Sequence, residues 1–303
     1  MIDWKEISNE LHQAVPGLSI LEEEPLARHT SFRIGGPAAL FVRPSDEKQL
    51  AQVLRFAASR DITPRILGAG TNVLAPDEGL RELVVCTKDA LLGISDLGDG
   101  KIEAYAGETL AKTAVFAKNR GLAGLEFAHG IPGTVGGGIY MNAGAYGGEM
   151  KQVAIETSVL TTDGETQVFS GDAQGFSYRT SAFEKSGAII VKTRLQLTPG
   201  DKAEIAAKMQ ELLEKRRASQ PLELPSAGST FKRPAGAYAG ALIEASGLKG
   251  RGVGGAEVSR KHAGFVVNRG GATAKDVLET IELVQKTVYA DSGFRLEPEV
   301  RIW

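Results

Sequence analysis

Three short segments of the chain carry side chains that are suited to acid–base and electrostatic chemistry. Arg179 lies in Tyr178-Arg179-Thr180-Ser181, a loop expected between two strands, where a guanidinium can bind a carboxylate through two parallel hydrogen bonds. Ser229 lies in a turn of small residues, and Lys232 and Arg233 follow it closely. These two cations would make the Ser229 hydroxyl a better hydrogen-bond donor and would help it to deliver a proton.

The third segment is Glu297-Pro298-Glu299-Val300, which places a carboxylate at the start of the last expected strand. Each candidate also has an ordinary interpretation, as a surface arginine, a turn serine or a solvated carboxylate. No one of the three segments decides by its local pattern between catalysis and these alternatives.

Other catalytic chemistries find little support in the sequence. The four histidines are far apart and show no His-Glu-x-x-His or paired spacing, and the single cysteine, Cys86, excludes the usual cysteine-rich zinc sites. We therefore expect no bound metal. The Gly-x-Ser-x-Gly pattern of serine hydrolases is also absent.

Glycine is unusually frequent, and two glycine-containing segments suggest ligand binding. The first, Gly68-Ala-Gly-Thr-Asn72, follows a strand expected at 62–67 but lacks the third glycine and the helix of a dinucleotide-binding fingerprint. No Gly-Lys-Ser/Thr occurs, so a P-loop is excluded. Glycine amides can still form a nest for a pyrophosphate, with a plain tight turn as the alternative.

The second glycine segment, 130–147, has a different composition. Ile131, Val135, Ile139 and Met141 make it too apolar for a flexible linker. Ordering so many glycines has a large entropic cost, which is expected where backbone must lie flat against a ligand. The two segments together favour a large planar cofactor that carries a pyrophosphate.

Composition and charge narrow the class of protein. The formal net charge is -2 and the pI is near 6.2, which argues against a polybasic nucleic-acid binder. No apolar run reaches the roughly 18 residues that span a bilayer. The first six residues are too polar for a signal peptide. We expect a soluble cytoplasmic protein with neither nucleic acid nor membrane as a partner.

Helical and strand patterns are mixed along the chain, without regular βα alternation or an internal repeat. They predict an α+β protein of two or three modules. Helices are expected near the N-terminus up to Pro16-Gly17, after Ser45 as a cap, from Leu110 to Gly121, from Asp201 to Arg217 and after Thr273 as a cap. Strands are expected at 62–67, 83–86, 102–105, 155–162, 166–169, 189–197, 264–268 and 299–302.

Taken together, these segments resemble the UDP-N-acetylenolpyruvoylglucosamine reductase (MurB) family of flavoenzymes. Any single motif is weak, but seven occur in the family's order and spacing and cover nearly the whole chain. They are the segments 28–36, 67–72, 130–138, 142–147, 178–181, 228–232 and 296–301. Tyr178-Arg179 has no tyrosine-bearing insertion after it, which is typical of the short (type II) subclass.

The resemblance implies an α+β fold of the FAD-binding p-cresol methylhydroxylase (vanillyl-alcohol oxidase) type. Two modules, 1–80 (joined by about 290–303) and 81–200, would clasp the flavin, and a C-terminal α+β domain, 201–289, would cover the substrate. FAD would be held without a covalent bond. The residues implied to bind it are Leu67, Gly68, Ala69, Gly70, Thr71, Asn72, Gly130, Ile131, Pro132, Gly133, Thr134, Gly136, Gly137, Asn142 and Ala145.

The resemblance also assigns roles to the three candidates. Arg179 matches the arginine that polarises the substrate carboxylate, Ser229 the serine that donates a proton, and Glu299 the glutamate that stabilises the intermediate. The residues implied to contact substrate are Tyr178, Arg216, Lys232, Arg233 and His262. Three of them, Arg216, Lys232 and Arg233, would form with Lys215 and Arg217 part of a positive wall for the carboxylate and diphosphate of the substrate. Arg233 and His262 depart from the Asn and Gln of some members.

The implied reaction is the NADPH-dependent reduction of UDP-N-acetylglucosamine enolpyruvate to UDP-N-acetylmuramate in peptidoglycan synthesis, by a monomer in the cytoplasm. Two other functions stay open. An oxidase of the same flavin fold would share both glycine segments but not the set of Arg179, Ser229 and Glu299. A non-enzymatic flavin- or nucleotide-binding module would leave these three residues without a role.

Overall fold

Two units make up the fold, and the computed structural model describes residues 2–303 of the chain. Each unit is assembled from stretches that are far apart in the sequence. Unit 1 consists of Met1–Glu23, Ala39–Ala69 and Arg81–Lys215, and unit 2 of Glu24–Ala38, Gly70–Leu80 and Arg216–Trp303. The three modules predicted above divide the chain differently, by function, and they stay a prediction.

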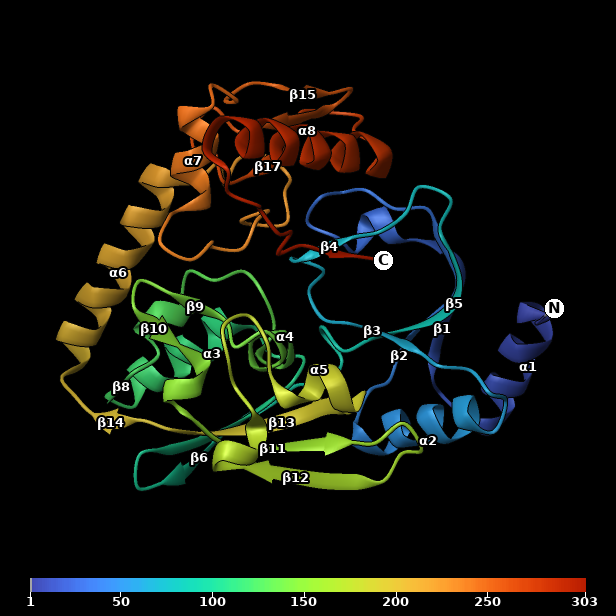
Figure 1. The fold of residues 1–303 in the computed structure, drawn as a ribbon. Helices are drawn as coiled ribbons and strands as arrows, with labels where there is room; N and C mark the ends of the chain where they lie inside the picture. The colour runs from blue at the N-terminus through green and yellow to red at the C-terminus, as the bar shows by residue number, and fades with distance from the viewer. Residues whose placement is uncertain (1) are drawn as a thin grey trace. The chain divides into compact units, whose positions relative to one another are not determined.

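The larger sheet of unit 1 is antiparallel throughout, in the order β12-β11-β13-β7-β6 (Figure 1). Its strands are β6 (Ile94–Gly98), β7 (Lys101–Tyr105), β11 (Ala154–Leu160), β12 (Thr166–Ser170) and β13 (Ile189–Gln196). The predicted hairpin between β11 and β12 is confirmed, and Gly164 in its turn has a φ of 78°. Strands and helices mix as predicted for an α+β protein.

A smaller sheet, most of whose residues belong to unit 1, has the order β1-β2-β5-β3. Its strands are β1 (Ser19–Pro25), β2 (Pro37–Arg43), β3 (Arg65–Leu67) and β5 (Leu80–Cys86), with β3 parallel to β5. The strand predicted at 62–67 is shorter than expected. The Ile62 N–H donates to Ala57 O at 2.9 Å and so closes the preceding helix, and Pro64 has no N–H to offer a ladder.

Helices α1 (Trp4–Ala14) and α2 (Glu47–Ala58) bury the apolar faces that the sequence predicts. The predicted cap of α2 is wrong by one residue. Asp46, and not Ser45, accepts the Gln49 N–H through its carboxylate at 2.8 Å, while the Ser45 N–H donates to the Gln49 side chain. A carboxylate at this position also suits the positive end of the helix dipole.

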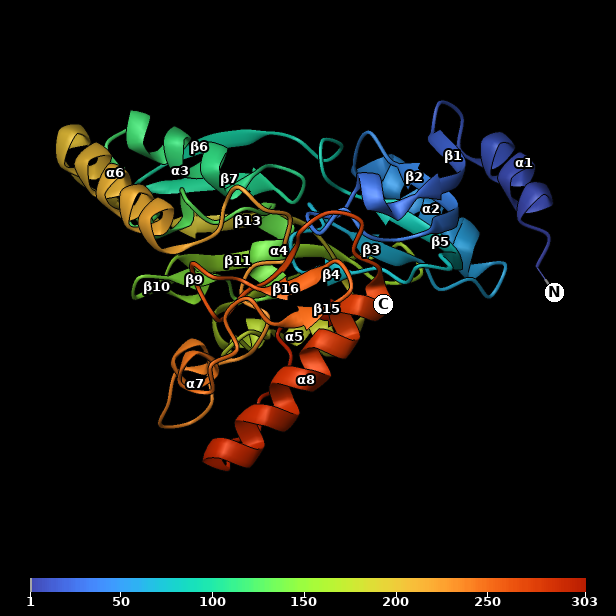
Figure 2. The ribbon, with the colours of Figure 1, turned by 90° about the horizontal axis from the view of Figure 1, so that it is seen from above.

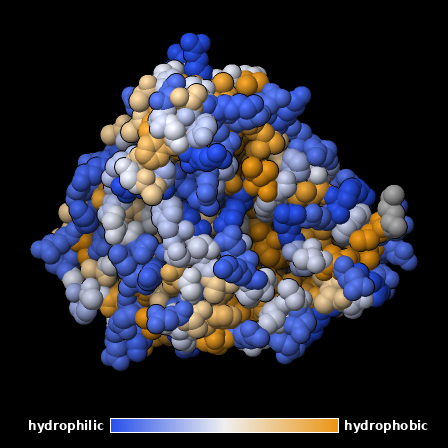
Figure 3. Space-filling view, in the orientation of Figure 1, coloured by the Kyte–Doolittle hydropathy of each residue, from blue (hydrophilic) through white to orange (hydrophobic). Residues whose placement is uncertain are grey.

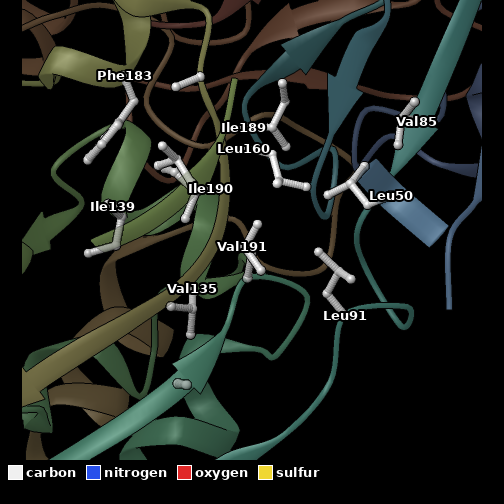
Figure 4. Packing of buried hydrophobic residues seen from close by; sticks show 14 of the residues in the cluster. Leu50, Val85, Leu91, Val135, Ile139, Leu160, Phe183, Ile189, Ile190 and Val191 are labelled. Carbon is white, nitrogen blue, oxygen red and sulfur yellow. The ribbon is translucent and has the colours of Figure 1, made fainter. Parts of the chain in front are cut away.

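Two longer helices and several short elements complete unit 1. They are α3 (Leu110–Asn119), β8 (Leu122–Ala123), α4 (Val135–Tyr140), β9 (Gly144–Ala145), β10 (Gly148–Glu149), α5 (Ala182–Ser186), β14 (Thr198–Pro199) and the start of α6 (Lys202–Ser219). Helix α6 runs two residues beyond the predicted end at Arg217. Figure 4 shows the core of this unit, in which Val135 and Ile139 of α4 pack with Ile190 and Val191 of β13.

Unit 2 is built around α8 (Ala274–Ser292), which packs against a three-stranded antiparallel sheet (Figure 2). The predicted cap is confirmed, because Thr273 and Asp276 form a reciprocal capping box. The other elements are α7 (Ala239–Ala245), β15 (Gly252–Val253), β16 (Ala256–Val258), β17 (Val266–Asn268), and β4 (Val73–Leu74) paired with β18 (Arg301–Ile302).

Early stretches of the chain complete the core of unit 2. Phe32, Ile34 and Leu74 are buried in the same apolar cluster as the inward face of α8. Asn268 Nδ2 donates to Phe32 O at 3.0 Å. Asp77 accepts the Ala274 N–H at 2.7 Å, so its carboxylate satisfies one of the unpaired amides at the start of α8.

The molecular surface in view is mostly hydrophilic, with small hydrophobic groups scattered over it (Figure 3). Within residues 2–303, no helix combines the length and the apolar composition needed to cross a membrane.

Candidate active site

The two glycine segments meet inside unit 1. A Cβ atom on Gly68 would lie 2.7 Å from Oγ1 of Thr134, closer than real Cβ contacts allow. Thr134 is the N-cap of α4, and its Oγ1 accepts the Gly137 N–H at 3.2 Å. Only glycine at position 68 lets the end of β3 lie this close to the second segment.

The second glycine segment contains a short helix that the sequence patterns do not predict. Six of its residues form α4, which packs against β13 (Figure 1) and also against β7. The glycines permit this helix because its backbone lies against neighbours: a Cβ on Gly136 would be 2.9 Å from Ala106 Cβ, and one on Gly138 would be 3.1 Å from Leu110 Cδ2. Close packing therefore explains part of the glycine content without a ligand.

Several amides of these segments are nevertheless available to a ligand. Among the described residues, the backbone N–H groups of Ala69, Gly133 and Thr134 have no protein acceptor. Buried or half-buried amides need a partner, and amides of this kind, gathered in turns, bind anions. This arrangement fits a pyrophosphate, as the sequence predicts.

The first glycine segment continues into unit 2. A Cβ on Gly70 would lie 2.0 Å from His29 O, and the φ of Gly70 is 62°, so this position also requires glycine. Asn72 Nδ2 donates to Glu299 O at 3.1 Å, and Asn72 O accepts the Arg301 N–H at 2.9 Å. Asn72 therefore contacts the backbone of the predicted catalytic Glu299.

Thr230, which follows Ser229 in the sequence, bonds to the backbone of Glu299. The Glu299 N–H donates to Thr230 O at 2.8 Å, and Thr230 N–H donates to Gly264 O at 2.8 Å. Thr230 Oγ1 accepts the Val266 N–H at 2.9 Å. The segment that carries Ser229 is thus held between the segments of Glu299 and Gly264.

This arrangement explains why two strands are shorter than predicted. The backbone groups of Gly264 and Glu299 bond to Thr230, so β17 and β18 begin two residues later than the sequence patterns indicate. Glu299 is half-buried, whereas Glu297 is exposed and pairs with Lys232 at 3.2 Å. The Ser229 hydroxyl is half-buried and makes no hydrogen bond within residues 2–303.

Arg179 lies in a tight turn of unit 1, closed by a backbone bridge between Ser177 and Thr180. Its φ is 58°, in the left-handed region that non-glycine residues seldom adopt. The guanidinium carbon lies 5.2 Å from the centre of the Tyr178 ring, which is half-exposed. The loop predicted here is confirmed.

The predicted substrate contacts of unit 2 lie at different depths. Arg233 is exposed, and its guanidinium carbon lies 3.8 Å from the centre of the Tyr238 ring. His262 is half-buried, and its Nδ1 accepts the Gly264 N–H at 3.1 Å. Burial lowers the pKa of His262, so at neutral pH its ring is uncharged and Nε2 carries the proton. Arg216, from α6, belongs to the same unit.

Asn142, a predicted cofactor residue, is buried, and both of its side-chain N–H groups bond to protein acceptors. The sequence patterns reveal neither this network nor the contacts of Thr230. Both depend on partners distant in the sequence, and no local periodicity or spacing signals such contacts. Among residues 2–303, no group of three His, Cys, Asp or Glu side chains is placed to hold a metal ion.

Comparison with known proteins defines first the class and then the family. The model of an FAD-binding domain matches residues 38–170, and alkyldihydroxyacetonephosphate synthase shares the fold over 65% of this chain and 41% of its own, at 14% identity and a TM-score of 0.50. The fold and the glycine segments thus define an FAD-binding protein of the p-cresol methylhydroxylase type.

Full-length relatives narrow this class. The C-terminal domain model of UDP-N-acetylenolpyruvoylglucosamine reductase matches residues 220–303. The enzyme of that name from Agathobacter rectalis is 45% identical, over 96% of both chains. The MurB crystal structure from Thermus caldophilus aligns at a TM-score of 0.79 and 35% identity, over 94% of this chain and 99% of that one. The chain belongs to the UDP-N-acetylenolpyruvoylglucosamine reductase family, and it is an FAD-dependent oxidoreductase.

Proposed function

We propose that this protein reduces UDP-N-acetylglucosamine enolpyruvate to UDP-N-acetylmuramate, with NADPH as the electron donor, in peptidoglycan synthesis. The observation that carries the proposal is the juxtaposition of Ser229 and Glu299 through Thr230, in a chain of this family. Ser181 leads directly into α5 without an insertion, which supports the short subclass. The cytoplasmic location of this protein, its monomeric state and its division into three modules stay predictions of the resemblance.

FAD would be held mainly by backbone. The N–H groups of Ala69, Gly133 and Thr134 would donate to pyrophosphate oxygens, and Gly68 and Gly136 would leave room for close approach. Bound FAD would supply the hydride chemistry, taking hydride from NADPH and delivering it to the terminal methylene of the enolpyruvyl group. The remaining work falls to side chains of this protein.

Those side chains would stabilise the negative charge of the intermediate and donate a proton to it. Hydride addition to the methylene places negative charge on the neighbouring carbon and toward the carboxylate. Arg179 would bind that carboxylate through two hydrogen bonds and, with Glu299, would stabilise the enolate-like intermediate. The Ser229 hydroxyl, which has no protein acceptor within residues 2–303, would donate the proton to that carbon.

Anaerobic titration followed by substrate addition tests the proposed function. NADPH should bleach the flavin absorbance of the holoenzyme, and UDP-N-acetylglucosamine enolpyruvate should restore it with formation of UDP-N-acetylmuramate. An oxidase would instead be re-coloured rapidly by oxygen and slowly by the nucleotide. A binding module would not turn over at all. Either result would contradict the proposal.

FAD should be bound without a covalent link, because the described site offers backbone amides and close glycine contacts. Acid or heat denaturation of the purified holoenzyme should release all the yellow colour into the supernatant. The measurement is the flavin absorbance of supernatant and pellet after centrifugation. Flavin that stays with the precipitated chain would refute this prediction.

Replacing Lys232 by methionine should raise the KM for the nucleotide by about 10-fold or more, with little change in the KM for NADPH, because a charge-assisted contact to the substrate is lost. Lys232 also pairs with Glu297 at 3.2 Å, so the variant frees a carboxylate. Glu297→Gln is therefore the matched control, and it should leave both constants nearly unchanged. Unchanged nucleotide binding in Lys232→Met would contradict the assignment.

A further inference from the structure

Asn142 uses its entire side-chain amide inside the protein. It is 1% exposed, and its Nδ2 donates to Glu149 Oε2 at 3.0 Å and to Ser177 O at 3.1 Å. Its Oδ1 accepts the Lys151 N–H at 2.9 Å. Both N–H groups are therefore committed to protein acceptors, and neither is left for a ligand.

One of these acceptors belongs to the turn that carries Arg179. Ser177 O, which accepts from Asn142, also accepts the Thr180 N–H at 3.3 Å across the turn. On the far side of the turn, the buried Ser181 Oγ donates to Tyr140 O at 2.8 Å. The turn is thus fixed at both ends to the segment formed by α4 and Asn142.

The backbone of Arg179 needs such fixing. Its φ of 58° lies in a region that is unfavourable for a side chain of this size, so the turn would relax if its ends were released. Asn142 itself has a φ of 42°, a conformation that asparagine tolerates better than most residues do. Residue type, backbone conformation and hydrogen bonding at position 142 all agree with a role in holding this turn.

We infer that Asn142 is a positioning residue for Arg179 and does not contact the cofactor. The inference rests on the proposed function, because it takes Arg179 as the group that binds the substrate carboxylate. It differs from the role that the family resemblance implies for Asn142, which is cofactor binding. Loss of Asn142 should therefore affect the half-reaction with the nucleotide and leave the half-reaction with NADPH unchanged.

Asn142→Gly is the variant of choice, because glycine accepts a positive φ and the change removes only the side chain. In stopped-flow measurements on the holoenzyme, flavin reoxidation by the nucleotide should slow about 10- to 100-fold, as expected for a displaced binding group. FAD content and the rate of reduction by NADPH should stay nearly unchanged. Asp89→Gly is the matched control: Asp89 is exposed, has a φ of 59°, and should tolerate the same change without effect.

A double variant shows whether Asn142 acts through Arg179. In an Arg179→Ala background, Asn142→Gly should slow reoxidation little further, because the group that it positions is already gone. Fully additive effects would overturn the inference, as would slower reduction by NADPH or weaker FAD binding in Asn142→Gly. If Asn142→Gly does not fold, Ser181→Ala removes the other attachment of the turn and should also slow reoxidation by the nucleotide but not reduction by NADPH; normal reoxidation in Ser181→Ala would overturn the inference. An Arg179→Ala enzyme with normal reoxidation would instead refute the proposed role of Arg179.

Discussion

Replacing Ser229 by alanine is expected to slow flavin reoxidation by the nucleotide about 10²–10⁴-fold, while reduction by NADPH stays nearly unchanged. Delivery of the hydride and of the proton are separate events, and only the second needs a hydroxyl at this position. The neighbouring Thr230 is held by three hydrogen bonds that do not involve the Ser229 side chain, so alanine should leave the local backbone in place.

Stopped-flow absorbance of the two half-reactions, run separately, decides this prediction. Ser229→Cys should recover part of the lost rate, because a thiol can deliver a proton from a similar position. Equal slowing of both half-reactions would assign a structural role to the serine. Normal reoxidation in Ser229→Ala would assign the proton to another group or to water.

Replacing Arg179 by lysine should weaken the reaction with the nucleotide about 10- to 100-fold, although the positive charge is retained. Lysine cannot reproduce two parallel hydrogen bonds to a carboxylate. The strained φ of 58° is not relieved by this change, because both residues carry a Cβ. The expected loss therefore reports on the guanidinium and not on the backbone of the turn.

The comparison for Arg179→Lys is Arg194→Lys, a change of the same kind at a surface residue of unit 1 that pairs with Glu103 and Glu156. Arg194→Lys should have normal kinetics with both substrates. The measurement is kcat/KM for the nucleotide at saturating NADPH. A lysine enzyme that matches the unmodified one would rule out a two-pronged contact at position 179.

The sequence predicts the elements whose stability is local. The apolar faces of α1 and α2 and the capping box at Thr273 depend on residues within about one or two helical turns of each other, so periodicity reveals them. The helix inside the second glycine segment could not be predicted in this way. Its glycines have poor helix propensity, and the close packing of Gly136 on Ala106 and of Gly138 on Leu110 arises only in the tertiary fold.

The same distinction between local features and long-range contacts applies to the candidate site. Residue type and family resemblance indicate three candidates, Arg179, Ser229 and Glu299. The structure shows the backbone and the local contacts around each of them. Thr230 bonds to the segments of Gly264 and Glu299, and Asn142 to the turn that contains Arg179, across 34 to 69 positions of the sequence. Pairings of this range follow from the tertiary fold, and residue type alone does not reveal them.

The assembly of unit 2 limits how this protein can exchange parts with its relatives. Residues 220–303 match a family model of their own, yet their core is completed by Phe32, Ile34 and Leu74, and Asp77 bonds the first amide of α8. A gene segment that encoded only the C-terminal stretch would be inherited without these four residues. Recombination between family members would thus preserve the unit only where all three stretches came from one parent, or where the parents agreed at these contacts.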